Sequence, residues 1–276
     1  MNREIIRTKN LMYTYATGTH ALRGISLDIN EGEKVALMGA NGSGKSTFFL
    51  NINGVLEPDS GEIFLRGEKI TKKNKNELRR KVGIVFQDAD SQIVASTVFG
   101  EVSFGPMNLK LPKEEVKERV EKALSYMNIS QYRSRPPHYL SGGEKKRVSI
   151  ADIIAMQPEM IIFDEPSAAL DPGSVEMLNQ VLERLADQNM TLLISTHDVD
   201  FAYAWAKRII VFDKGKIIAD DTPENIFLRE DILQQARLKQ PVLLQVAGLM
   251  KERNLLGEQD YPKTFEQLKE QMDSFR

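Results

Sequence analysis

The chain has 276 residues, 41% of them hydrophobic and 28% charged, with a formal net charge of −2 and no cysteine. Its length and apolar content allow a sizeable core, in one large domain with an appendage or in two modest domains. The balanced charge excludes nucleic-acid binding driven by bulk positive charge, and the lack of cysteine excludes disulfides and thiolate metal sites. No apolar run approaches the roughly 18 residues of a membrane span, and the first residues do not resemble a signal peptide, so we expect a cytoplasmic chain.

The apolar pattern predicts alternating strands and helices, with a helical stretch between them. Short strands are expected within residues 5–29, and a buried strand at 35–38. The lysine-rich stretch at 72–81 is interpreted as a solvated face, and residues 88–158 have helical character, including a helix near 114–127. The remaining expected elements are strands at 63–65, 82–86, 160–163, 191–195, 209–212 and 216–219, and helices at 175–186 and 199–206. This order predicts an α/β core interrupted by an all-helical subdomain.

The last part of the chain is predicted to form a small helical appendage. The threonine, proline and glutamate at 222–224 match an N-cap, a proline at the first helical position and an acidic first turn. Thr264 followed by Gln267 matches a capping box at the start of a second helix. We therefore divide the chain into a main domain at 1–221 and an appendage at 222–276.

A glycine-rich motif follows the strand at 35–38 and opens a helix. Its members are Gly39, Ala40, Asn41, Gly42, Ser43, Gly44, Lys45, Ser46 and Thr47. The glycines allow a tight turn whose N–H groups point at phosphate oxygens, and the positive end of the helix dipole faces the same anion. Lys45 adds a point charge for the β- and γ-phosphates, and the Ser46 hydroxyl is a ligand for Mg²⁺. The strand before the motif and the helix after it disfavour the alternative, an ordinary turn with a solvated lysine.

Three further segments end in polar residues that suit phosphoryl transfer. Asp164 and Glu165 follow an apolar strand, where Asp164 would hold Mg²⁺ and Glu165 would polarise or deprotonate the attacking water. Gln87 would reach Mg²⁺ or this water, and His197 would hydrogen-bond the γ-phosphate or the water. A charged strand end, a lone glutamine or a lone histidine is more often structural, so these roles depend on the phosphate loop.

Ser141, Gly142, Gly143 and Glu144 begin another predicted helix. The glycines expose backbone N–H groups and the helix dipole favours an anion, which makes a second phosphate cradle in a chain that already has one. Two cradles in one chain suggest that one of them serves a nucleotide held by a neighbouring chain. The alternative is a plain N-capped helix.

Together these motifs resemble those of the ATP-binding subunits of ABC transporters, over residues 5–219. The loop at 167–171 completes the set, with serine and alanine where many relatives carry threonine and glycine. The resemblance implies a P-loop NTPase core with an antiparallel β subdomain, and ATP and Mg²⁺ as cofactors. It also implies that Tyr15, or less well Tyr13, stacks on adenine. In this family ATP lies in a head-to-tail dimer, between one chain's phosphate loop and the other chain's signature helix, which here would begin with the signature residues Ser141, Gly142, Gly143 and Glu144.

A narrower resemblance rests on segments around and after these motifs. They lie at residues 86–93, 104–106, 138–148, 155–159 and 222–227. They are similar to the energy-coupling factor ATPases, which drive uptake of vitamins and of cobalt or nickel, and most similar to the cobalt-transport ATP-binding proteins of the CbiO type. This implies that the appendage at 222–276 helps to hold an ATPase dimer. The implied partners are a second ATPase copy or paralogue, a transmembrane coupling subunit and a substrate-binding membrane subunit, at the cytoplasmic face of the membrane.

Several alternatives stay open beside this reading. The nearest are an ATPase of the same type for nickel or a vitamin, and a subunit of a conventional ABC importer or exporter. An ABC protein without a transporter would carry two cassettes, a long coiled coil or a basic tail, and the sequence has none of these. A regulatory module that holds nucleotide without turnover would have an altered Glu165 or His197, and both are intact. We expect no nucleic-acid partner.

Overall fold

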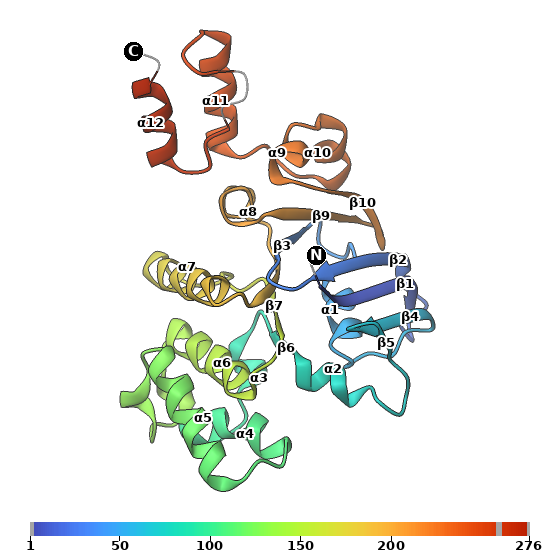
Figure 1. The fold of residues 1–276 in the computed structure, drawn as a ribbon, viewed down its shortest axis with the longest axis vertical. Helices are drawn as coiled ribbons and strands as arrows, with labels where there is room; N and C mark the ends of the chain where they lie inside the picture. Colours follow the sequence, from blue (N-terminus) through green and yellow to red (C-terminus); the bar gives the residue numbers. More distant parts are fainter. Residues whose placement is uncertain (1–2, 258–260, 275–276) are drawn as a thin grey trace.

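The computed structural model describes residues 3–257 and 261–274, and they form two β-sheets with helices around them (Figure 1). The four-stranded antiparallel sheet has the order β2-β1-β4-β5, with β1 at Glu4–Thr14, β2 at His20–Asn30, β4 at Ser60–Leu65 and β5 at Glu68–Lys69. The six-stranded sheet has the order β10-β9-β3-β8-β7-β6, with β3 at Lys34–Met38, β6 at Val82–Val85, β7 at Met160–Asp164, β8 at Thr191–Ser195, β9 at Arg208–Asp213 and β10 at Lys216–Asp221. The predicted fold class is confirmed.

The strands of the six-stranded sheet are parallel, except for the antiparallel edge strand β10. Each strand is a continuous apolar run because it is buried on both faces. In β3, for example, Ala36 and Met38 join one core cluster, while Val35 and Leu37 join the other. Parallel strands place all their carboxyl ends at one edge, so the polar residues that follow β3, β6, β7 and β8 come together there.

The two faces of this sheet are covered differently. On one face, α1 (Lys45–Ile52) buries Phe48, Phe49 and Ile52 in a cluster shared with the antiparallel sheet. On the other face lie α7 (Pro172–Asp187), α8 (Val199–Trp205) and the helical subdomain. A further helix, α2 (Asn76–Lys81), lies inside the lysine-rich stretch and buries only Leu78.

The strands predicted within residues 5–29 are longer than expected. They form the hairpin of β1 and β2, with 11 residues in each strand. Gly24 lies inside β2 with a φ of 87°, where the pairing register shifts. The glycine therefore allows a bulge in one long strand rather than ending it.

The helical stretch after β6 forms a separate lobe, at the bottom of Figure 1. It contains α3 (Ala89–Gln92), α4 (Val98–Asn108), α5 (Lys113–Tyr126), short 3₁₀ turns at Ser130–Tyr132 and Pro137–Tyr139, and α6 (Gly142–Met156). Helix α5 presents Val116, Val120 and Leu124 to the shared core, at the spacing of one helix face. Helix α5 thus packs on α4 and α6 inside the lobe, and α6 packs on strand β6 of the sheet.

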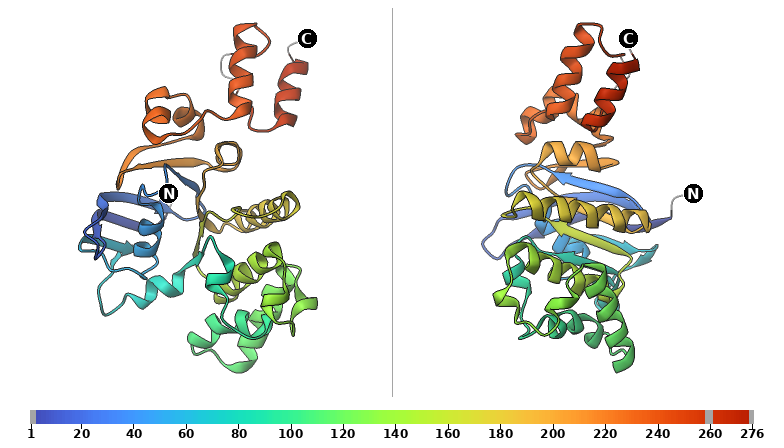
Figure 2. Two further views of the ribbon diagram at one scale, coloured as in Figure 1. Left: turned by 180° about the vertical axis from the view of Figure 1, so that it is seen from behind. Right: turned by 90° about the vertical axis from the view of Figure 1, so that its left-hand side faces the viewer.

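The described part of the tail contains the helices α9 (Pro223–Phe227), α10 (Glu230–Ala236), α11 (Val242–Glu252) and α12 (Phe265–Ser274). Helices α9 and α10 bury apolar side chains in the main core, whereas α11 and α12 project away from it (Figure 2). Thr264 Oγ1 accepts from the Gln267 N–H, and the Gln267 side chain accepts from the Lys263 N–H, one residue earlier than a capping box requires.

The predicted division into a main domain and an appendage stays a prediction. Within both predicted regions some positions, namely residues 1–2, 258–260 and 275–276, lie outside the described residues. Among the described helices, none combines the length and apolar character needed to cross a membrane.

Candidate functional site

The polar residues at the carboxyl edge of the six-stranded sheet surround one cavity of about 400 Å³. Among the predicted site residues, its lining includes Tyr15, Asn41, Gly42, Ser43, Gly44, Lys45, Ser46, Thr47, Gln87, Asp164, Glu165 and His197. The sequence places these residues far apart, but the parallel strand order brings them together. Of the predicted phosphate-loop residues, Gly39 and Ala40 do not line the cavity, and their carbonyl oxygens accept hydrogen bonds from the Lys45 side chain.

The phosphate loop has a backbone that requires glycine at two of its positions. A Cβ on Gly39, which has a φ of 133°, would lie 2.1 Å from the Phe212 carbonyl oxygen. A Cβ on Gly44, with a φ of 110°, would lie 2.6 Å from the Ala21 carbonyl oxygen. Any other residue at these positions would displace the backbone of a neighbouring segment, so the tight turn depends on both glycines.

Two side chains of the loop provide groups that fit a phosphate. The Lys45 Nζ donates to the carbonyl oxygens of Gly39 at 2.8 Å and Ala40 at 3.3 Å. Burial lowers the pKa of Lys45, and the nearby carboxylates Glu165 and Asp164 act against this shift. The Ser43 Oγ is buried without a protein hydrogen-bond partner and faces the same cavity. An anion there would accept from both the ammonium and the hydroxyl.

Asp164 and Glu165 are held in place by β8, the neighbouring strand. The Ser195 Oγ donates to Asp164 Oδ1 and accepts from the Glu165 N–H at 2.9 Å. Glu165 has a φ of 45°, a left-handed conformation that costs energy in a residue other than glycine and that turns its side chain out of the strand direction. Such backbone strain is commonly found at active sites.

Glu165 and His197 form a pair in this cavity. The His197 Nε2 lies 3.0 Å from Glu165 Oε1. Burial raises the pKa of Glu165, while His197 and Lys45 oppose the shift. A carboxylate that is more basic than usual is a better acceptor for a proton from water. Ser46, Gln87 and Asp164 add oxygen donors of the kind that Mg²⁺ prefers, and all of them line the cavity.

Of the two tyrosines considered for adenine, only Tyr15 lines the cavity. Its hydroxyl lies 3.0 Å from Thr47 Oγ1, and its ring meets the Tyr13 ring edge-on at a centroid distance of 5.0 Å. Tyr15 is 38% exposed and borders the cavity, so it is accessible to a ligand there. Tyr13 therefore supports Tyr15 rather than replacing it.

The second predicted cradle, Ser141 to Glu144, lies outside the phosphate-loop cavity. Ser141 caps α6, because its Oγ accepts from the Glu144 N–H at 3.3 Å and the Glu144 carboxylate accepts from the Ser141 N–H at 2.7 Å. A Cβ on Gly142 would meet nothing within 4 Å, whereas a Cβ on Gly143 would lie 2.2 Å from Ser174 Oγ. Gly142 thus faces open space at a helix N-terminus, and Gly143 packs against α7.

Some residues that line the cavity were not predicted as site residues. They are Thr19, His20, Ala21, Arg23 and Lys214. They come from the β1–β2 hairpin and the β9–β10 turn, which the fold places beside the phosphate loop. His20 also lies with its Nδ1 3.0 Å from Thr14 Oγ1. No local sequence pattern marks these positions, since only the tertiary fold brings them to the loop.

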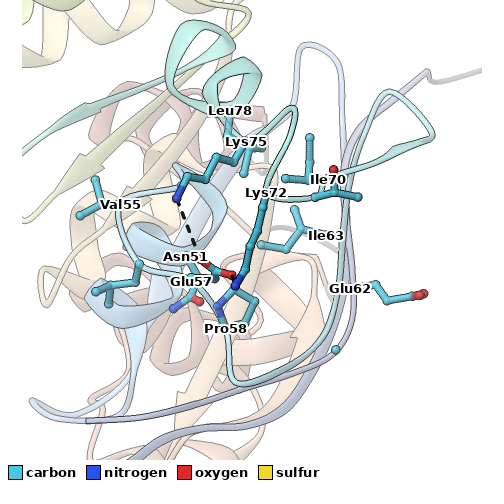
Figure 3. A pocket seen from close by; sticks show the side chains of 14 residues that line it. Asn51, Val55, Glu57, Pro58, Glu62, Ile63, Ile70, Lys72, Lys75 and Leu78 are labelled. Carbon is cyan, nitrogen blue, oxygen red and sulfur yellow. Dashed lines mark ion pairs between the residues drawn. The ribbon is translucent and has the colours of Figure 1, made fainter. Parts of the chain in front are cut away.

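A second cavity of about 250 Å³ lies between the end of α1, β4 and α2 (Figure 3). Glu57 lies there with its carboxylate 3.3 Å from the Lys72 Nζ and 3.9 Å from the Lys75 Nζ. The lysine-rich stretch is therefore partly neutralised by this glutamate. None of the predicted site residues lines this second cavity.

Comparisons with known proteins identify the family of this chain. Residues 22–168 match the family model described as ABC transporter. The chain is 45% identical to the energy-coupling factor transporter ATP-binding protein EcfA2 of Methanospirillum hungatei, over 94% of this chain and 66% of that protein, so it spans just under two thirds of that relative. It is 44% identical to EcfA of Methanocaldococcus jannaschii, over 91% of this chain and 90% of that protein.

A solved structure is also similar in fold. It is CbiO1 from Clostridium perfringens, described as part of the ABC transporter complex CbiONQ. The two chains share 38% identity with a TM-score of 0.75, over 90% of this chain and 99% of that one. Fold, site and relatives therefore agree that this chain belongs to the ABC transporter family, among its ATP-hydrolysing subunits of the energy-coupling factor type.

Proposed function

We propose that the chain binds Mg-ATP together with a second ATPase copy or paralogue, closes on it, hydrolyses it, and transmits the motion to membrane subunits that import cobalt. The observation that carries this proposal is the division of the site. The phosphate loop, Gln87, Asp164, Glu165 and His197 share one cavity, while the signature residues lie outside it.

In the first half of the site, the residues of one chain bind the nucleotide. Tyr15 stacks on adenine, and the loop N–H groups, Ser43 and Lys45 bind the β- and γ-phosphates. The oxygen donors of Ser46, Gln87 and Asp164 would hold Mg²⁺. When bound, this ion neutralises charge on the phosphates.

In the hydrolysis step, Glu165 accepts a proton from the attacking water as the water oxygen bonds to the γ-phosphorus and the bond from that phosphorus to the bridging oxygen of ADP breaks. His197, 3.0 Å from that carboxylate, orients it and reaches the γ-phosphate. The raised pKa of Glu165 and its fixed backbone suit this base role, because the Ser195 contact holds its N–H in place. The reaction releases ADP and phosphate, and the bonds from the γ-phosphate to both chains are lost.

In the second half of the site, the partner chain supplies Ser141, Gly142 and Gly143. The open face of Gly142 and the N-terminus of α6 offer N–H groups to a γ-phosphate that another chain holds. Glu144 fixes this terminus through the capping box. A head-to-tail dimer would complete two such sites at once.

The helical subdomain, residues 88–158, is the proposed contact with a transmembrane coupling subunit. Its surface exposes Val94, Phe104 and Met107, with 73%, 54% and 63% of each side chain accessible. Phe104 and Met107 lie one turn apart on α4, and exposed apolar side chains that lie together are typical of protein contacts. Through these partners, which include a substrate-binding subunit, the ATPase would sit at the cytoplasmic face of the membrane.

The appendage, residues 222–276, is the proposed dimerisation element. Helices α11 and α12 project from the core, and among the described residues a small buried cluster there consists of Ala247, Leu256 and Leu268. Apolar residues outside that cluster, Val242, Leu249 and Phe265, are 59%, 59% and 69% exposed. A second chain would cover them.

Cobalt is proposed for two reasons. The segments around and after the ATP-binding motifs are most similar to those of cobalt-transport ATP-binding proteins, and one solved structure of similar fold is CbiO1. Nickel, a vitamin, or a conventional ABC transporter are the alternatives. Purification of the tagged chain from membranes, followed by cobalt, nickel and vitamin uptake by the recovered complex, distinguishes them. Cobalt uptake that Glu165→Gln abolishes supports the proposal, and a complex that imports only a vitamin or nickel, or that exports, refutes the cobalt assignment.

A further inference from the structure

A lysine from the signature helix is buried against the backbone of Gln87. Lys146 is only 3% exposed. Its Nζ donates to the carbonyl oxygens of Phe86 at 2.9 Å and Gln87 at 2.7 Å. These bonds join two segments that are 60 and 59 residues apart in the sequence. A buried ammonium is costly unless it is well bonded, so the position is one where an apolar side chain would otherwise be expected.

Other contacts tie the same loop to the same helix. The Gln92 side chain accepts from the Phe86 N–H at 3.2 Å and donates to the Ser149 carbonyl at 3.5 Å. Lys145, next to Lys146, donates to the Asp90 carboxylate at 2.6 Å. The N–H and the carbonyl oxygen of Phe86 are therefore both hydrogen-bonded to side chains of other residues. Among these contacts, only the one from the Lys146 ammonium reaches Gln87 itself.

We propose that Lys146 is a positioning residue that fixes the Gln87 loop to the signature helix of the same chain. This inference rests on the proposed function, in which Gln87 contacts Mg²⁺ or the attacking water. The backbone of Gln87 determines where its side-chain amide lies. Lys146 donates to the carbonyl oxygen just before Gln87, that of Phe86, and to the carbonyl oxygen of Gln87 itself. Because Lys146 follows Ser141, Gly142 and Gly143 on one rigid helix, the signature helix and the Gln87 loop move as one unit when the dimer closes.

Loss of the ammonium should therefore act on turnover more than on ATP binding. Lys146→Met removes the N–H donors but keeps a long side chain, which leaves two carbonyl oxygens unbonded and frees the loop. A displacement of about 1 Å at a reacting group costs up to roughly 100-fold in rate. We expect kcat to fall about 10- to 100-fold, with the ATP dissociation constant within about 3-fold of wild type.

The absence of cysteine from this chain allows a chemical rescue. Lys146→Cys should show the same loss, and alkylation with 2-bromoethylamine, performed on the unfolded chain before refolding, restores an ammonium at nearly the lysine length. Alkylation with 1-bromopropane restores the length without the ammonium. We expect the first reagent to recover kcat and the second not to. Lys122→Met is the matched control, because Lys122 makes a surface pair with Glu118 in the same lobe and should keep wild-type turnover.

A double-mutant cycle tests whether the effect passes through Gln87. In a Gln87→Ala background, Lys146→Met should lower kcat no further. The inference would be overturned if the double variant lost kcat by the product of the two single losses. It would also be overturned by a folded Lys146→Met chain with wild-type kcat, or by equal recovery of kcat with both alkylating reagents. If Lys146→Met does not fold, Lys146→Gln, which keeps two N–H donors, is compared with Lys146→Leu in the same cycle. A wild-type chain without ATPase activity would instead refute the proposed function itself.

Discussion

Replacing each of the two adjacent signature glycines by alanine should affect a different property, stability for Gly143 and turnover for Gly142. At Gly143, a Cβ would lie 2.2 Å from Ser174 Oγ and 2.9 Å from Ser174 Cβ. Ser174 Oγ also donates to the Asp171 carboxylate at 2.6 Å, in the cap that begins α7. Overpacking of this kind costs ~1–3 kcal/mol, and the better helix propensity of alanine offsets up to ~1 kcal/mol of that. Gly143→Ala should therefore lower the free energy of unfolding by about 1–2 kcal/mol.

Gly142→Ala should leave the fold intact and damage only the composite site. Its Cβ would meet nothing within 4 Å, so the free energy of unfolding should stay within about 0.5 kcal/mol of wild type. The methyl group would stand where a partner's γ-phosphate approaches, and we expect turnover to fall at least ~10-fold while one chain still binds ATP. Guanidinium unfolding and phosphate release measure the two effects. Gly142→Ala with normal turnover would refute the reasoning, as would equal destabilisation by both substitutions.

Three further results are expected from the same geometry. Glu165→Gln should bind ATP normally, lose turnover by about 100-fold or more, and accumulate closed dimers; undiminished phosphate release would refute the base role. Lys45→Ala should weaken ATP binding about 10- to 100-fold by titration calorimetry, and near-normal affinity would count against the cradle. Burial, aided by the charge of Glu101, raises the pKa of Asp152 to about 7. The folded chain then holds a proton that the unfolded chain loses near pH 4, so the free energy of unfolding should fall by up to ~4 kcal/mol as pH rises from about 4 to 7. Asp152→Asn should remove this slope, and a persistent slope would contradict the assignment.

The parts of the site that could be predicted are those carried by strands. Asp164 and Glu165 end an apolar run that is buried on both faces, and the phosphate loop begins where another such run stops. Continuous apolar runs identify central parallel strands, and parallel strands share a carboxyl edge. The meeting of these motifs around one cavity follows from that rule alone.

The parts that could not be predicted depend on contacts between distant segments. Arg23 and Lys214 line the cavity from hairpins whose own sequences carry no phosphate-binding pattern. Lys146 is part of a charged run, Glu144 to Arg147, which by itself indicates a solvated helix face, and only the packing of α6 against the Gln87 loop buries it. Helix α2 was missed because a single buried residue, Leu78, gives no helical period.

The central claim is that each ATP-binding site is completed by the signature residues of a second chain. An experiment that mixes two inactive variants tests this claim most directly. Lys45→Ala damages only the phosphate loop, and Ser141→Arg damages only the signature helix. Each variant alone should be inactive, since every composite site would then contain one damaged half. An equimolar mixture that exchanges subunits should recover up to about a quarter of the wild-type phosphate release, because half of its dimers contain one intact site of two. Full activity of Ser141→Arg alone, or a mixture as inactive as its components despite shown exchange, would contradict the account.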